Sequence, residues 1–128
     1  MKFNCKEISI SDEEFGCTVT LSENDEKYGH EKEQTVEEIM NSLGQYIMLQ
    51  RTYAEDEFEE DFYYFETSDF DKSGELNDFK ITLTETEFIL TFENEKYEIQ
   101  ITPDRRVYEE LKKALIKVTE QIGKLFIQ

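Results

Sequence analysis

Tryptophan is absent from this chain of 128 residues, and proline occurs only once. Histidine also occurs once, as His30, so no Ser-His-Asp triad or Cys-His pair can form except around that single residue. Neither a GxGxxG nor a GxxxxGKS/T segment is present, which excludes the common nucleotide-binding fingerprints. These absences predict a protein that is not an enzyme and that needs no cofactor.

Cysteine is scarce as well, and Cys5 and Cys17 are its two examples. Neither belongs to a CxxC pair or to a cluster of cysteine and histidine, so no metal site of the zinc type is expected. If the chain turns near Asp12, Cys5 lies opposite Val19 or Thr20, too far from Cys17 for a disulfide. We therefore expect two small, buried thiols.

Long hydrophobic runs are missing, and no apolar stretch approaches the ~18 residues that a membrane span needs. Met1–Asn4 lacks the apolar character of a signal peptide, so we expect a cytoplasmic protein with no membrane contact. Apolar residues still make up 38% of the chain, with ten Phe and seven Tyr among the aromatic residues. This content predicts a single domain over residues 1–128 with its own core.

The chain has few positive charges, with 14 basic side chains against 31 acidic ones and a net charge of −17. Six of the basic side chains lie in residues 104–128, so the rest of the chain is more acidic still. A body of this sign repels nucleic acid and anionic lipid, whereas it attracts a basic protein and speeds the encounter. The acidity could equally serve solubility alone.

Alternation of apolar and polar residues predicts a mostly antiparallel β-sheet of about seven strands. The clearest part is a meander, in which three short alternating runs are separated by spacers of hairpin length. These runs are Phe79–Leu83, Phe88–Phe92 and Tyr97–Ile101. The strand at Gln45–Tyr53 carries bulky residues on both faces, which is typical of a position in the middle of a sheet.

The N-terminal residues predict a hairpin. Phe3–Ile10 alternates with a change of phase at Lys6-Glu7, which predicts one strand with a bulge. Ser11–Glu14 is expected to form the turn, and the returning strand from Phe15 to Leu21 alternates cleanly. Ser22–Gln34 is polar and is expected to be a loop.

Two helices complete the prediction of an α+β fold. Thr35 and Glu38 form a capping box for a short central helix that ends at Gly44. A long C-terminal helix is expected from Asp104 to about Gly123, with an apolar stripe along one side. The apolar tail that follows, Leu125 to Ile127, should dock on the sheet or add an edge strand.

The central strand leads into Ala54–Asp61, a loop in which six of eight residues are acidic. No apolar pocket signal accompanies these carboxylates, so a solvated charge run is favoured over catalysis. Phe58 within the run could anchor a partner, as hot-spot aromatic residues do, or could fold back on the sheet edge. Arg51 is expected either to pair with Glu66 or an acid of this loop, or to contact a partner. The candidate partner-binding residues are Arg51, Glu55, Asp56, Glu57, Phe58, Glu59, Glu60 and Asp61.

Asp69–Lys80 resembles the calcium-binding loop of an EF-hand in its first six positions, which end at Gly74. The last position should be a bidentate Glu and is Lys80, and the flanking residues predict strands where an EF-hand has helices. A turn rich in Asp, Asn and Gly explains the same residues. We therefore place no metal here, although weak calcium binding is left open.

Several motifs follow one another in a characteristic order. Tyr46–Arg51 ends in Leu-Gln-Arg and precedes the acidic loop, and an aromatic strand at Phe62–Glu66 follows. A turn at Asp71–Gly74 and the amphipathic strand Phe79–Leu83 complete the series. This series, within residues 44–101, resembles the immunity protein 10 family, small bacterial proteins predicted to neutralise toxins of polymorphic toxin systems.

The resemblance implies a protein that acts by binding a cognate toxin and has no catalytic residues. Toxins that act on nucleic acid are basic, and an acidic inhibitor would meet them by electrostatic steering. We expect the contact surface at Glu55–Asp61 and in the loop Ser22–Glu33. The alternative is an acidic mimic of nucleic acid that inhibits another basic enzyme, such as a phage-encoded inhibitor.

Overall fold

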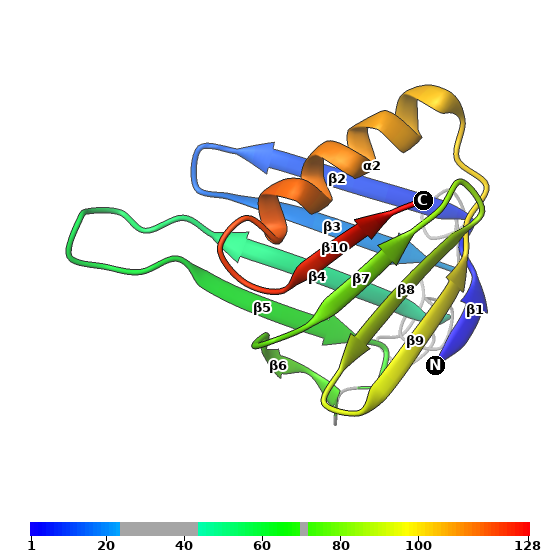
Figure 1. Ribbon diagram of the computed structural model, residues 1–128, viewed down its shortest axis with the longest axis horizontal. Coiled ribbons are helices and arrows are strands. Elements are labelled where there is room, and N and C mark those ends of the chain that lie inside the picture. Colours follow the sequence, from blue (N-terminus) through cyan, green and yellow to red (C-terminus); the bar gives the residue numbers. More distant parts are fainter. Residues whose placement is uncertain (24–43, 70–71) are drawn as a thin grey trace, which may run out of the picture.

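The computed structural model describes residues 1–23, 44–69 and 72–128 of the chain. These residues form an α+β fold with ten strands in two five-stranded sheets and one helix (Figure 1). The predicted central helix and nearly all of the predicted loop Ser22–Gln34, including His30, lie outside the described residues.

Sheet 1 is antiparallel and has the strand order β2-β3-β4-β5-β6. Its strands are β2 (Glu7–Glu13), β3 (Gly16–Ser22), β4 (Tyr46–Thr52), β5 (Phe62–Thr67) and β6 (Gly74–Glu75). The middle position of β4 confirms the prediction for the central strand. Ile47, Leu49 and Arg51 of β4 are buried, whereas Tyr46 and Met48 on its other face are half-buried.

Sheet 2 has the strand order β1-β9-β8-β7-β10. Its strands are β1 (Lys2–Asn4), β7 (Lys80–Leu83), β8 (Glu87–Phe92), β9 (Glu95–Gln100) and β10 (Lys124–Ile127). The predicted meander is confirmed as β7, β8 and β9. Glu93 and Asn94 join β8 to β9 with φ values of 51° and 66°, the left-handed pair that a two-residue hairpin turn requires.

The prediction of about seven strands in one sheet was wrong, because the N-terminal segment serves both sheets. The change of phase at Lys6-Glu7 is not a bulge but the point where the chain leaves one sheet for the other. Residues before it pair in parallel with β9, with Phe3 opposite Ile99. Residues after it pair with β3, with Ile8 opposite Leu21. The edge strands β6 and β10 add to the count.

The one helix of the described residues, α2 (Arg105–Val118), begins where it was predicted. The Asp104 carboxylate caps it by accepting a hydrogen bond from the Val107 N–H at 2.8 Å. The helix ends five residues before Gly123, and the Thr119 hydroxyl donates to the Leu115 carbonyl at 2.8 Å. The predicted long C-terminal helix, which was expected to reach about Gly123, was therefore too long.

The chain after α2 turns back and adds β10 in parallel to β7, which confirms the predicted edge strand. Gly123 makes the turn with φ 76°, a conformation that favours glycine. A Cβ at this position would lie 2.7 Å from the Phe79 ring, so the close approach also requires glycine.

The molecule has two layers. Sheet 2 and α2 lie side by side over one face of sheet 1 (Figure 1). The Phe65 ring of β5 joins the two sheets, because its centroid lies 5.6 Å from that of Phe92 and 5.2 Å from that of Tyr97. The helix covers the β2, β3 and β4 side with buried apolar residues, which are Leu111, Ala114, Leu115 and Val118. No helix among the described residues has the length and apolar character to cross a membrane.

Candidate functional site

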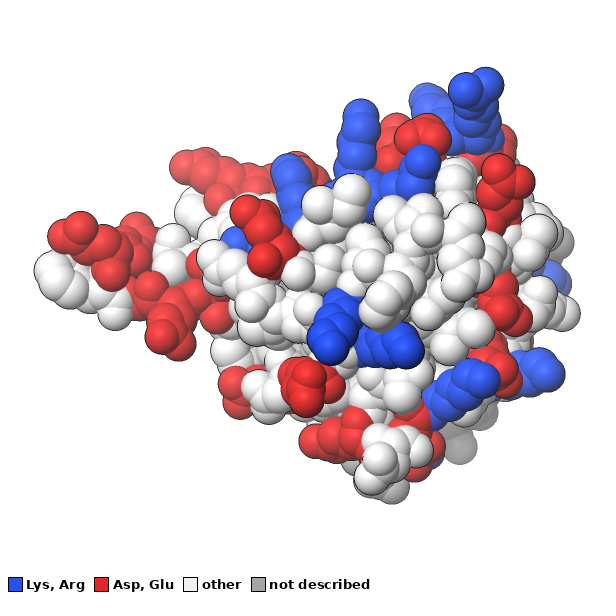
Figure 2. All heavy atoms as spheres, in the orientation of Figure 1, with Lys and Arg blue, Asp and Glu red and all other residues white. Residues whose placement is uncertain are grey.

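The acidic loop between β4 and β5 projects from one end of the molecule (Figure 1). Acidic side chains cover this projection in the space-filling view (Figure 2). Glu55, Asp56, Glu57, Glu59 and Glu60 are all exposed. None of the five carboxylates forms an ion pair with a basic side chain in the part of the chain that the structure describes.

Phe58 lies within this loop and is 89% exposed, so it does not fold back on the sheet edge. The loop holds it out through local hydrogen bonds, because the Asp56 carboxylate accepts from the Phe58 N–H at 2.9 Å. The Glu59 N–H donates to the Asp56 carbonyl at 3.4 Å, which closes the turn. An aromatic ring is thus presented to solvent among exposed carboxylates.

Arg51 fixes the base of the loop. Its guanidinium donates from Nε to Asp61 Oδ2 at 2.7 Å, and from a terminal nitrogen to the Lys117 carbonyl at 2.6 Å and to Glu120 at 3.0 Å. The side chain is only 7% exposed. Because the Lys117 carbonyl lies in the last turn of α2, the positive charge also meets the negative end of the helix dipole. One residue therefore ties β4, the loop and the helix together.

The predicted ion pair between Arg51 and an acid of the neighbouring loop is present, and that acid is Asp61. The other predicted partner, Glu66, instead accepts hydrogen bonds from the hydroxyls of Tyr46 at 3.0 Å and Tyr64 at 3.3 Å. The Arg51 and Asp61 side chains are 7% and 12% exposed, so both point toward the interior and not toward a partner. Of the candidate residues, these two brace the surface and the other six form it.

A second set of contacts joins the turn between β2 and β3 to the same end of the molecule. The Tyr53 hydroxyl donates to Asp12 at 3.2 Å, and Lys117 pairs with the same carboxylate. The hydrogen bond from Lys117 holds the pKa of Asp12 below its usual value. The Tyr53 N–H donates to the Phe15 carbonyl at 2.9 Å, so the turn lies directly beside the start of the acidic loop.

The sequence prediction was wrong about the position of this neighbouring turn and about the exposure of one of its residues. The turn was predicted at Ser11–Glu14, but β2 continues to Glu13 and the turn is formed by Glu14 and Phe15. Phe15 was expected to face inward with Cys17, yet it is 69% exposed. Phe15 continues the alternation of apolar residues in β3, but the pairing of β3 with β2 begins only at Gly16, so Phe15 lies in the turn and not in the strand.

The exposed residues of the loop and of the neighbouring turn lie at the same end of the molecule (Figure 1), and together we call them the acidic tip. Phe62, at the start of β5, belongs to it and is 50% exposed. The acidic tip comprises Glu13, Glu14, Phe15, Glu55, Asp56, Glu57, Phe58, Glu59, Glu60 and Phe62. Three exposed aromatic rings among exposed carboxylates can bind a basic protein surface, because the rings supply contact area and the carboxylates supply attraction.

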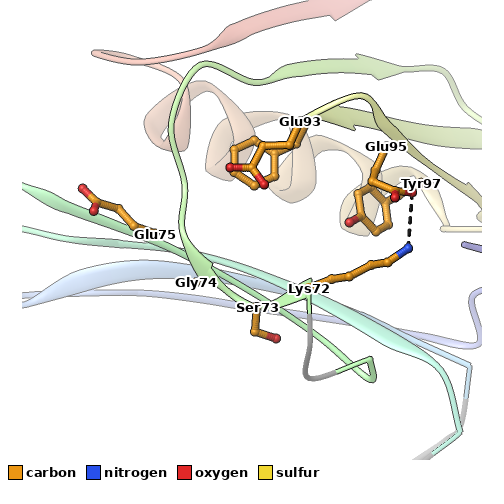
Figure 3. A pocket seen from close by; sticks show the side chains of 8 residues that line it. Lys72, Ser73, Gly74, Glu75, Glu93, Glu95 and Tyr97 are labelled. Carbon is orange, nitrogen blue, oxygen red and sulfur yellow. Dashed lines mark ion pairs between the residues drawn. The ribbon is translucent and has the colours of Figure 1, made fainter.

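Two side chains of the turn that resembles a calcium-binding loop, those of Lys72 and Ser73, are engaged in contacts within the protein. The Ser73 hydroxyl accepts from the Thr67 N–H at 3.1 Å, and Lys72 pairs with Glu95 at 3.3 Å across a hollow of about 320 Å³ (Figure 3). Gly74 starts strand β6, opposite Phe65. Among the described residues no group of three or more His, Cys, Asp or Glu could hold a metal ion. The local contacts are those of a polar turn between strands.

The two cysteines are free and buried, as expected. They lie in different surroundings, because Cys5 follows β1 and Cys17 faces α2, where its Sγ lies 3.9 Å from the Ala114 carbonyl. Burial raises the pKa of both thiols, so neither is an activated nucleophile.

The Asp61 carboxylate gives the brace a defined pH dependence. Hydrogen bonds from the Ala54 N–H and from Arg51 hold the pKa of Asp61 below its ordinary value of 3.8. A lowered folded-state pKa contributes stability above the unfolded value, and this is lost as pH falls through the folded value. We expect wild type to exceed Asp61→Asn in free energy of unfolding at neutral pH, and this advantage to shrink below about pH 4. Urea denaturation across this range measures it, and a constant difference would contradict it.

No protein-family model matches this chain, and no curated protein or solved structure is detectably similar to it. The membership of the immunity protein 10 family that the ordered motifs within residues 44–101 suggest therefore stays a prediction.

Proposed function

We propose that this chain is a bacterial immunity protein that binds and neutralises a cognate basic toxin through the acidic tip. The observation that supports this most directly is Phe58, which is 89% exposed in a loop whose five carboxylates have no basic partner among the described residues. Leaving a large aromatic side chain in water within a braced loop gives the free protein no stability, whereas it provides an anchor for a partner.

The proposed partner is a protein and not a nucleic acid or a membrane. The net charge of −17 opposes phosphate backbones and anionic lipid. A surface that carries carboxylates can instead occupy the phosphate-binding groups of a basic toxin. In this proposal the chain carries out no reaction, and inhibition follows from occupying the toxin. The expected site of action is the cytoplasm, where the toxin would otherwise act.

The test is co-expression of the chain with the product of the neighbouring gene. We expect rescue of growth, a complex that co-purifies, and an association rate that falls about tenfold or more between low and physiological salt. The salt dependence follows because exposed charges attract each other less as the screening length shortens.

Failure of both rescue and binding would end the proposal for that gene pair. If the neighbouring product is not a toxin but the chain inhibits a basic nuclease, the mimic of nucleic acid replaces the immunity protein as the function. An association rate that does not change with salt would show that the partner does not recognise charge.

A further inference from the structure

The outer face of sheet 2 carries four lysines from four different strands. One row across the sheet places Lys124 opposite Lys80, Lys80 opposite Thr91, and Thr91 opposite Lys96. The adjacent row runs from Phe126 through Thr82 and Ile89 to Glu98 and Lys2. Directly opposed residues point to the same side of a sheet, so these side chains share one surface. We call this surface the lysine face, defined by Lys2, Lys80, Lys96, Lys124 and Phe126.

The lysine face is unusual in a protein with so few basic side chains. Of its lysines, only Lys96 pairs with a carboxylate, that of Glu98 at 3.2 Å, within the described residues. Lys80 and Lys124 lie directly opposite each other, an arrangement of like charges that destabilises a sheet. Lys80 Nζ lies 5.0 Å from the Phe126 ring centroid, and this ring is 44% exposed. The repulsion between Lys80 and Lys124 and the exposure of the Phe126 ring do not stabilise the fold, whereas both are useful on a surface that binds a partner.

The charge on this surface is opposite to that of the acidic tip. Figure 2 shows basic side chains over the centre of the visible face and over α2, and acidic side chains on the projecting loop. The loop projects past the end of sheet 1, whereas the lysine face is the outer side of sheet 2 (Figure 1), so the two surfaces are expected to meet between copies. Repulsion between two net-negative molecules is screened beyond ~8 Å at physiological ionic strength. The charges at the contact itself therefore decide whether the two copies attract or repel each other.

We propose that the lysine face is a docking surface for the acidic tip of a second copy of this chain. Carboxylates such as Glu57 and Glu59 would meet Lys80 and Lys124, and the exposed Phe58 ring would pack beside Phe126. The contact joins two different surfaces, so each dimer still offers one free tip and one free face. Association of this kind covers the acidic tip, so a basic partner must displace the second copy in order to bind there.

The decisive experiment uses one variant of each surface. In the tip variant Glu57→Lys and Glu59→Lys are combined, and in the face variant Lys80→Glu and Lys124→Glu are combined. Sedimentation velocity at physiological salt is measured up to about millimolar concentration, where weak association is populated. We expect wild type to show larger species as concentration rises and each variant alone to stay monomeric.

An equimolar mixture of the two variants at physiological salt is the sharper measurement. The variants retain complementary wild-type surfaces, so the face variant supplies an intact tip and the tip variant an intact face. Such a mixture should associate, because each variant supplies the surface that the other lacks. The reversed charges on the two altered surfaces are also complementary to each other, so species larger than a dimer agree with the proposal, whereas two variants that stay monomeric when mixed contradict it.

A matched control changes the same number of charges elsewhere. Arg106→Glu with Lys113→Glu alters two exposed residues of α2 and should leave association like that of wild type. Wild type that remains monomeric at every concentration, or a mixture that does not form a dimer, would overturn the proposal. This inference concerns self-association alone, so its failure would leave rescue of growth by the acidic tip unaffected, and the face variant should still neutralise the toxin.

Discussion

Replacing Arg51 with methionine is expected to lower the free energy of unfolding by about 3–5 kcal/mol. Methionine keeps most of the apolar stem but removes the group that pairs with Asp61 at 2.7 Å. Among the described residues, the Asp61 carboxylate, 12% exposed, would then keep only the Ala54 N–H as a donor, and the Lys117 carbonyl would lose its hydrogen bond from Arg51. A buried charge left without its partner is far more costly than the net contribution of the pair.

Other contacts of Arg51 contribute less to this effect. The Glu120 carboxylate is 62% exposed, so water replaces the lost ion pair at little cost. The guanidinium carbon lies 5.1 Å from the Tyr53 ring centroid and 5.8 Å from that of Tyr63, which adds a smaller cation–π component. Most of the expected loss therefore comes from Asp61 and from the end of α2.

Urea denaturation measures the loss, and two further variants make it specific. Arg106→Met on the exposed face of α2 should change the free energy of unfolding by no more than about 0.5 kcal/mol. Combining Arg51→Met with Asp61→Asn should recover part of the loss, because no unpaired charge remains buried. Equal losses for Arg51→Met and Arg106→Met would show that Arg51 is not the brace of the loop.

The residues that could be predicted from sequence are those whose structure is set locally. The meander follows from strict alternation and short spacers, and the start of α2 follows from the capping side chain of Asp104. The pairing of Arg51 with a loop acid could also be predicted. A guanidinium on a central strand has to meet a carboxylate, and Asp61 is brought back by the hairpin.

The features that could not be predicted depend on pairing between distant segments. The parallel pairing of β1 with β9 joins residues more than ninety positions apart, with Lys2 opposite Glu98, and no local period encodes it. A single sheet was predicted for this reason. The lysine face shares this origin, because its four lysines come from β1, β7, β9 and β10. Phe15 shows the remaining limit, since alternation does not reveal where a strand ends and a turn begins.

Replacing Phe58 with alanine is expected to weaken binding of the cognate partner by about 2 kcal/mol or more, roughly thirtyfold, with most of the change in the dissociation rate. The ring is 89% exposed in the free protein, so its removal should leave the free energy of unfolding unchanged. The neutralised variant Glu55→Gln, Glu57→Gln, Glu59→Gln should instead slow association and flatten its dependence on salt. Surface plasmon resonance against the purified partner separates the two rates.

Phe126→Ala is the matched control for Phe58→Ala. Its ring is also exposed, at 44%, but it belongs to the lysine face and not to the acidic tip. The proposed function predicts that this control binds the partner like wild type, and self-association through the lysine face predicts that it associates less with itself. If Phe58→Ala binds as tightly as wild type while the neutralised variant does not, charge alone carries recognition. If both variants bind like wild type, the partner contacts another part of the chain and the acidic tip is not the site.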